Sequence, residues 1–125
     1  MAVAFKKKVG TIKTLVVALS GSTVTTDLFD FSTVWSTNQQ FFVRTHWVAK
    51  DDGDTSKGAM GQRQCVVRES GGTLSINSQN NGETLLTIGA MVTMSYAVSA
   101  GKLQMTITND GSITGEVLLR VYVDY

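Results

Sequence analysis

The feature that most constrains the fold is a two-residue alternation of side chains in four separate segments. It runs through residues 41–49 (FFVRTHWVA), 91–98 (MVTMSYAV), 102–108 (KLQMTIT) and 116–125 (EVLLRVYVDY). Successive side chains of a β-strand point to opposite faces of a sheet, so this alternation is typical of half-buried strands. Because no long segment repeats with a helical period, the chain is predicted to be all-β.

The same alternation predicts which side chains face the core. The inward set is expected to be Phe41, Val43, Thr45, Trp47, Ala49, Val92, Met94, Tyr96, Val98, Leu103, Met105, Ile107, Val117, Leu119, Val121 and Val123. The opposite face then carries Phe42 on one strand and Leu118, Arg120 and Tyr122 on the last. Aromatic residues and arginine are enriched at protein interfaces, so we expect these four to contact another subunit.

Turn-forming residues separate the strands. Clusters of Gly, Asn, Asp and Ser occur at residues 20–22, 51–54, 70–72, 80–82, 99–101 and 109–112. This spacing favours a sandwich or barrel of antiparallel strands. The polar segment 51–62 is predicted to be a long exposed loop. We expect a single domain, with residues 1–22 as a basic segment and first strand and residues 23–125 as the sandwich.

Composition excludes several functional classes. The net charge is +1 and 17% of residues are charged, so the chain lacks the basic face of a nucleic-acid-binding protein. No segment is long and apolar enough for a membrane helix, and the apolar run 15–19 is shorter than the core of a signal peptide. Proline is absent, so the edges of the sheets are protected by other means, such as a partner.

Chemistry-bearing residues are few and do not form a catalytic pattern. The single cysteine, Cys65, permits no intrachain disulfide and is predicted to be a small buried hydrophobe. The single histidine, His46, has Arg44 and Lys50 as neighbours, and their charges oppose the imidazolium that a catalytic base becomes. We therefore expect an exposed or interface histidine, and neither an enzyme nor a zinc site.

One acidic segment resembles half of a calcium-binding loop. Residues 51–56 (DDGDTS) have the alternating acidic residues, but Gly53 comes too early and position twelve of the loop is Gln62 instead of glutamate. A solvated loop is the better interpretation. Neither GSTVTTD nor SGGTLS precedes a helix, so neither forms a phosphate-binding loop. We expect no metal and no cofactor.

From residue 24 onward, the chain resembles a β-sandwich module that recurs in tailed-bacteriophage virion proteins. An aromatic strand, an Asp-Gly loop, a basic strand before Gly-Gly-Thr-Leu and a Gly-x-Leu strand carry the resemblance. The matching residues are Phe41, Val43, Trp47, Asp52, Gly53, Gly58, Ala59, Arg63, Arg68, Gly71, Gly72, Thr73, Leu74, Gly101, Leu103, Met105, Ile107 and Thr108. Two positions depart from the module: Val117 replaces a tryptophan and Asn109 replaces a glycine.

The resemblance implies an all-β, antiparallel β-sandwich, jelly-roll-like, with about eight strands. Such modules usually form trimers on a virion surface. We therefore expect a capsid decoration protein that binds the major capsid protein as a homotrimer and cements the phage head. The residues expected to contact partners are Phe5, Lys6, Lys7, Lys8, Lys13, Phe42, Leu118, Arg120 and Tyr122.

Two other functions remain open from the sequence. One is a tail-fibre, head-fibre or receptor-binding component that contacts host glycans, for which Trp35 and the segment 36–40 (STNQQ) are candidates. The other is a cellular jelly-roll adhesion or lectin domain without a phage connection. Neither alternative requires a membrane or nucleic acid as a partner.

Overall fold

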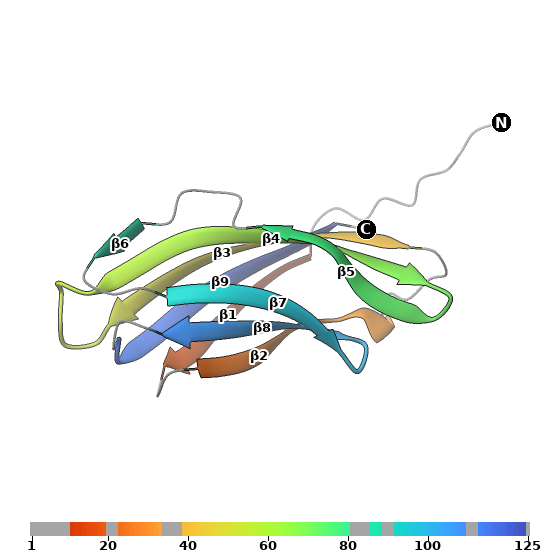
Figure 1. The fold of residues 1–125 in the computed structure, drawn as a ribbon. Coiled ribbons are helices and arrows are strands. Elements are labelled where there is room, and N and C mark those ends of the chain that lie inside the picture. Colours follow the sequence, from red (N-terminus) through yellow and green to blue (C-terminus); the bar gives the residue numbers. More distant parts are fainter. Residues whose placement is uncertain are drawn as a thin grey trace.

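A computed structural model describes residues 11–19, 23–33, 39–80, 86–88, 92–109 and 113–124. In these residues the chain forms two antiparallel sheets packed face to face (Figure 1). The elements are β1 (Thr11–Leu19), β2 (Thr23–Asp30), the 3-10 helix η1 (Phe31–Thr33), β3 (Gln40–Asp51), β4 (Gly58–Ser70), β5 (Thr73–Asn80), β6 (Leu86–Ile88), β7 (Val92–Ser99), β8 (Lys102–Asn109) and β9 (Gly115–Asp124).

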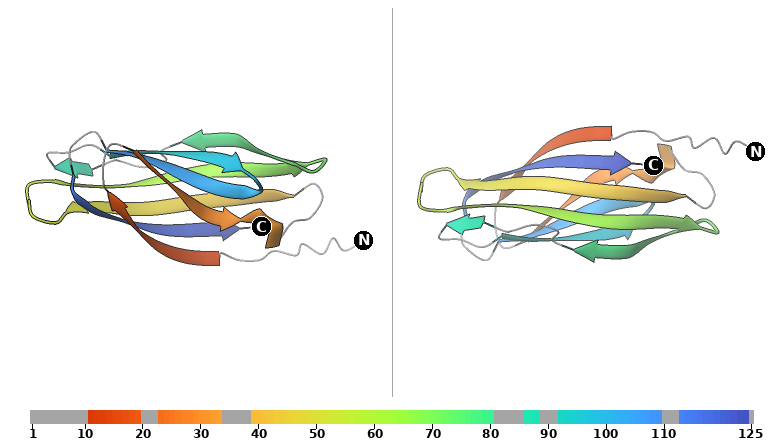
Figure 2. Two further views of the ribbon diagram at one scale, coloured as in Figure 1. Left: turned by 90° about the horizontal axis from the view of Figure 1, so that it is seen from below. Right: turned by 90° about the horizontal axis from the view of Figure 1, so that it is seen from above.

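The larger sheet has the strand order β1-β9-β3-β4-β5, and the short strand β6 pairs with β4. The smaller sheet has the order β2-β8-β7. Figure 2 shows the small sheet on one side of the molecule and the large sheet on the other. Strands β3, β4 and β5 follow one another as hairpins, and β9 returns beside β3. The first and last strands of the chain therefore lie beside β3 in the order β1-β9-β3.

The predicted antiparallel sandwich is confirmed, whereas the predicted jelly-roll arrangement is not. The two outer pairs of a jelly roll are formed, β1 with β9 and β2 with β8. In a jelly roll the next pair would join β3 to β7. Here β3 lies between β9 and β4, and both of its edges are occupied within the large sheet.

The prediction that residues 51–62 form one long exposed loop is wrong. Strand β3 continues to Asp51 and β4 begins at Gly58, so only residues 52–57 connect them. Ala49 pairs with Ala59 and Lys50 with Gly58, and Ala59 is buried. Small residues hide the alternation in this segment, but pairing with the regular strand β3 holds it in the sheet.

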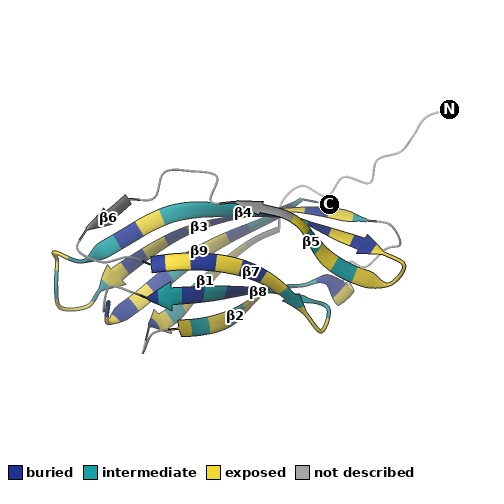
Figure 3. Cartoon of the chain, viewed as in Figure 1, coloured by how far each residue is buried: buried dark blue, intermediate teal, exposed yellow. Residues whose placement is uncertain are grey.

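The core lies between the sheets, and Figure 3 shows buried and exposed residues alternating along the strands. Every residue predicted to face inward is buried except Val98, which is partly buried. The structure adds core residues that no alternation revealed. Leu28 and Phe31 are completely buried near the end of β2, where a bulge between Asp27 and Phe29 interrupts the period of two.

One polar contact joins the two sheets inside the core. The hydroxyl of Tyr96 on β7 lies 2.8 Å from Thr45 Oγ1 on β3 and 2.7 Å from the carbonyl oxygen of Arg63 on β4. Tyr96 and Thr45 are both buried, and burial raises the pKa of Tyr96. Buried polar groups are costly unless they are hydrogen-bonded, so this contact fixes how the small sheet sits on the large one.

Two tight turns end the hairpins at one end of the sandwich. Gly71 and Gly72 connect β4 to β5, and both have positive φ. Ala100 and Gly101 connect β7 to β8, and both also have positive φ, 50° and 77°. Two positive φ values are the mark of the type I′ turn, whose twist matches that of a hairpin. Alanine at such a position is strained, because its Cβ crowds the following carbonyl.

Replacing Tyr96 with phenylalanine is expected to destabilise the fold by ~1–3 kcal/mol, because it leaves the buried Thr45 hydroxyl without its tyrosine partner. Urea unfolding would measure the loss. Tyr122→Phe is the matched control, since the Tyr122 ring lies on the outer face, and it is expected to cost less than ~0.5 kcal/mol. If the double variant Thr45→Val/Tyr96→Phe loses the full sum of the two single effects, the two hydroxyls are not coupled and the interpretation fails.

Candidate functional site

The two outer faces of the sandwich differ in chemistry. The outward face of the small sheet is rich in hydroxyl groups, contributed by Thr23, Thr25, Thr93, Ser95, Thr106 and Thr108. Its polar groups contact one another: Gln104 Nε2 donates to Asp27 over 2.9 Å, and Lys102 Nζ lies 3.6 Å from the Asp27 carboxylate. This face has the character of an ordinary solvated surface.

The outward face of the large sheet carries apolar side chains in register. Val16 on β1 lies opposite Leu118 on β9, Leu118 lies opposite Val48 on β3, and Val48 lies opposite Met60 on β4. Val16, Val48 and Met60 are exposed by 60%, 39% and 47%, and Leu118 is half-buried. We call these four residues the apolar row. It crosses four adjacent strands, a distance of about 14 Å at ~4.8 Å per strand.

Charged and aromatic side chains lie next to the apolar row. On the two central strands β3 and β9, His46 lies opposite Arg120 in the strand register, and Arg44 lies opposite Tyr122. The Arg44 guanidinium carbon lies 5.6 Å from the centre of the Tyr122 ring, and the His46 and Tyr122 rings are 5.4 Å apart. We call Arg44, His46, Arg120 and Tyr122 the cationic block. In Figure 2, right, strands β1, β9, β3 and β4 lie side by side across this face.

The cationic block contains guanidinium groups without a carboxylate partner among the residues that the structure describes. The ion pairs among the described residues join Lys57 to Asp54 and Lys102 to Asp27, and both lie away from the cationic block. Arginine has five N–H donors and accepts no hydrogen bond, and its planar fork fits a carboxylate. The block therefore offers donors to an acidic group, beside an apolar surface.

The structure brings together four of the residues predicted to contact a partner. Phe42, Leu118, Arg120 and Tyr122 all point outward from the large sheet, and Phe42 is 51% exposed. Lys13 is not part of this set. It is exposed, but it pairs with the inward-facing Val121, so its side chain lies on the other side of the sheet at the edge strand β1.

Several predicted residues lie outside the described part of the chain: Phe5, Lys6, Lys7, Lys8, Trp35 and residues 36–38. The sequence also did not reveal the apolar row as a unit. Val16, Val48 and Met60 are far apart in the chain, and only the register of four strands aligns them. The alternation places both Val48 and Leu118 outward, but it does not show that they lie opposite each other or that Val16 and Met60 extend the row.

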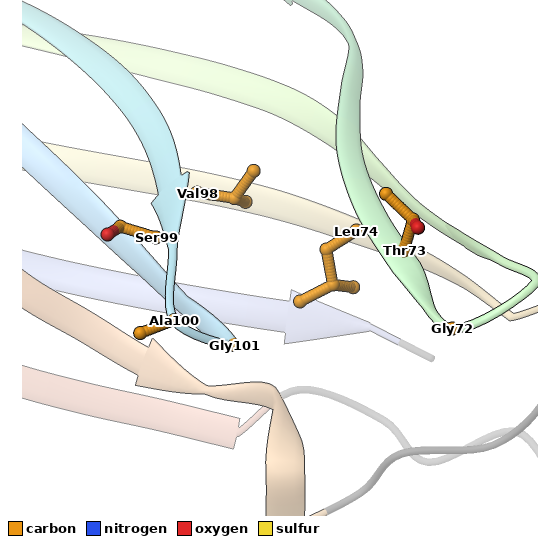
Figure 4. A pocket seen from close by; sticks show the side chains of 7 residues that line it. All are labelled: Gly72, Thr73, Leu74, Val98, Ser99, Ala100 and Gly101. Atoms are coloured by element: carbon orange, nitrogen blue, oxygen red, sulfur yellow. The ribbon is translucent and has the colours of Figure 1, made fainter.

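A pocket of about 240 Å³ lies at the end of the sandwich, between the β4–β5 and β7–β8 turns (Figure 4). Leu74 and Val98 come to it from the two sheets, and Thr73 and Ser99 contribute hydroxyl groups. The other lining residues are Gly72, Ala100 and Gly101. None of these residues is ionisable, so the pocket lining supplies no acid, base or charged nucleophile.

The two residues with catalytic potential lie on opposite faces of the large sheet. Cys65 is buried, as predicted, and burial raises the pKa of its thiol to about 12. His46 is exposed on the outward face. A thiolate needs a low pKa and a nearby base to act as a nucleophile, and the Cys65 thiol has a high pKa. In the described residues there is no group of three His, Cys, Asp or Glu side chains that could hold a metal ion.

The acidic loop between β3 and β4 uses its carboxylates to hold the backbone. Asp51 Oδ1 accepts from the N–H groups of Gly53 and Asp54, at 2.9 and 2.8 Å. Asp51 Oδ2 accepts from the N–H of Thr114 over 2.9 Å, which ties this loop to the start of β9. The bond from Thr114, followed by that from Gly53, lowers the pKa of Asp51. The carboxylate of Asp51 therefore stabilises the conformation of this loop by accepting hydrogen bonds from the backbone.

Comparisons with known proteins bear on the fold. No protein-family model matches the chain, and no curated protein matches it. Among solved structures it is similar to the crystal structure of Acinetobacter baumannii phage AM24 tailspike protein, with a TM-score of 0.58 and 8% sequence identity. The match covers 94% of this chain and 26% of that protein. The chain shares its fold with a segment of a phage tailspike.

No helix among the described residues is long and apolar enough to cross a membrane.

Asp51→Asn is expected to lower the free energy of unfolding at neutral pH. It is also expected to reduce the loss of that free energy when the pH falls. The folded-state pKa of Asp51 lies below its ordinary value of 3.8, so its contribution is present above that value and is lost as the pH falls further. Urea unfolding at pH 7 and at about pH 3 would show a smaller difference in the variant than in the wild type. The exposed neighbour Asp52 provides the control: if Asp52→Asn has the same effect, the hydrogen bonds of Asp51 are not the cause.

Proposed function

We propose that the chain is a structural component of a phage virion and acts by binding another protein through the outward face of its large sheet. The contrast between the two outer faces is the observation that carries this proposal. One face is covered by hydroxyl groups, whereas the other presents the apolar row, Phe42 and the cationic block. Aromatic residues, methionine and arginine are the residues enriched at protein interfaces.

The energetics favour a partner on this face. Burying a valine or methionine side chain completely contributes ~1.5–3 kcal/mol. Val16, Val48 and Met60 retain a third to two thirds of their exposure, so covering them contributes about 1 kcal/mol each. Val48 lies on the central strand β3 and Met60 on its neighbour β4, whereas Val16 lies on the edge strand β1. This regular sheet surface can meet a partner with little reorganisation.

The specific form that we propose is a capsid decoration protein. A homotrimer would contact the major capsid protein on the head surface, and three modest contacts would add through effective concentration. Phe42, Leu118, Arg120 and Tyr122 would contribute from the sheet, and the basic segment with Phe5, Lys6, Lys7, Lys8 and Lys13 would reach an acidic shell. The resemblance to phage virion modules supports this form, and it requires no catalytic residue, cofactor or nucleic acid.

The alternative is a tail-fibre, head-fibre or receptor-binding component that contacts host glycans. The fold shared with a segment of a phage tailspike over 94% of this chain favours this alternative. The pocket between the two turns, with the hydroxyls of Thr73 and Ser99, lies at an end of the sandwich where loops of other β-sandwiches bind ligands. The two forms differ in where the chain is located in the particle.

Cryo-electron microscopy of the intact particle that encodes this chain tests the proposal. Density for the sandwich at local threefold points of the head, with the large sheet against the shell, is the result expected for a decoration protein. Density at the tail or at a fibre tip would reject decoration and leave the tail alternative. Mass spectrometry of purified particles provides the control, and a complete absence of the chain from them would contradict both forms.

A further inference from the structure

We infer that the outward face of the large sheet recognises an acidic partner protein, whose carboxylates lie beside an apolar ridge, and not a second copy of the same face. This inference rests on the proposed function, because it specifies the partner that the binding face takes. Its elements are the apolar row (Val16, Leu118, Val48 and Met60) and the cationic block beside it.

The charges on this face are arranged with cations at the centre. Arg44 and Arg120 occupy the middle of β3 and β9, and His46 lies opposite Arg120. The carboxylates on the same face stand at the ends of β9: Glu116 opposite Lys50 near its start, and Asp124 opposite Phe42 at its end. Arg68 adds a further exposed cation on β4. Among the residues that the structure describes, the centre of the face therefore carries arginines and no acidic side chain.

Covering the cationic block has a cost that only an acceptor can offset. A guanidinium group removed from water without a carboxylate or carbonyl partner loses its hydration and gains nothing in return. The Tyr122 ring beneath Arg44 holds that side chain in a defined place, with a contact of the cation–π type. An entirely apolar partner would match the apolar row and leave Arg44 and Arg120 uncompensated. Carboxylates are the acceptors that compensate these charges best, so an acidic partner fits this face better than an apolar one.

The same charges disfavour pairing between two copies of this face. A twofold contact centred on the cationic block would place Arg44 and Arg120 against the arginines of the other copy. Like charges brought together in an interface repel each other and disfavour association. Self-association through other surfaces, such as the sheet edges, is unaffected by this argument.

The geometry of the apolar row describes the shape of the partner. The row crosses the strands at ~4.8 Å per strand, which is close to the 5.4 Å rise of one helical turn. An amphipathic helix laid across the strands would place one apolar side chain on each of β1, β9, β3 and β4. Acidic residues along one side of that helix would then meet the cationic block. A synthetic helical peptide with this arrangement of apolar and acidic residues is therefore a suitable probe of the face.

Nuclear magnetic resonance titration of the full chain with two synthetic helical peptides provides the test. One peptide carries leucine along one stripe and glutamate beside it, and the other has lysine in place of glutamate. The glutamate peptide is expected to shift the backbone amides of Val48, Leu118 and Arg120. Arg120→Glu is expected to weaken its binding about tenfold or more, the range for removing one partner of a close charge pair.

Lys102→Glu is the matched control, since it makes the same change in net charge beside Asp27 on the outward face of the small sheet. It is expected to leave binding of the glutamate peptide within about twofold. Arg120→Gln, which only removes the charge, keeps the test valid if Arg120→Glu does not fold. Equal binding of the lysine peptide, equal weakening by Lys102→Glu, shifts confined to the hydroxyl-rich face, or no binding would each overturn the inference.

Analytical ultracentrifugation of the wild-type chain tests whether this face binds a second copy of the chain. Self-association that is lost in Met60→Glu, on the apolar row, would assign this face to a second copy and overturn the inference. The peptide titration uses purified chain, so its outcome is independent of the location in the particle. A chain that is absent from particles but binds the glutamate peptide contradicts the proposed function alone. A chain that is present in particles but does not bind contradicts the inference alone.

Discussion

The packing of alternate side chains between the two sheets is the constraint on which the rest of the structure depends. Phe41, Leu119 and Met105 are completely buried on β3, β9 and β8. Once these residues face inward, their neighbours must face outward, because a shift of one residue would turn every side chain to the other side. The hydroxyl of Tyr96, held by Thr45 and Arg63, adds a directional contact that fixes one sheet relative to the other.

The exposed surface follows from this packing, and its asymmetry suggests the function. Both sheets bury an apolar face against each other, but among the described residues the large exposed apolar side chains, Val16, Phe42, Val48 and Met60, all lie on the outward face of the large sheet. A sheet that is solvated on one side needs no such residues for folding. Val16, Val48 and Met60 therefore do not contribute to the core. Contact with a partner protein would explain why apolar residues occupy these exposed positions. The arginines beside them add a requirement for charge complementarity.

The sequence was sufficient to predict the fold class and most of the core, because a period of two is a local signal. Phe42, Leu118, Arg120 and Tyr122 were placed on an outward face for the same reason. Properties that depend on pairing between distant strands were not predictable. The apolar row requires the register of four strands, the position of β3 between β9 and β4 requires the topology, and the side on which Lys13 lies requires its pairing with Val121. Residues 58–62 were misassigned because small residues carry little alternation.

Oxidative footprinting of Met60 in the intact particle is the measurement that tests the central claim most directly. Met60 is 47% exposed on the outward face of the isolated chain, and a thioether reacts with hydroxyl radicals in proportion to its accessibility. If a partner covers this face, Met60 is oxidised in the free chain and protected in the particle. Equal oxidation of Met60 in the free chain and in the particle would contradict the assignment of this face as the contact surface.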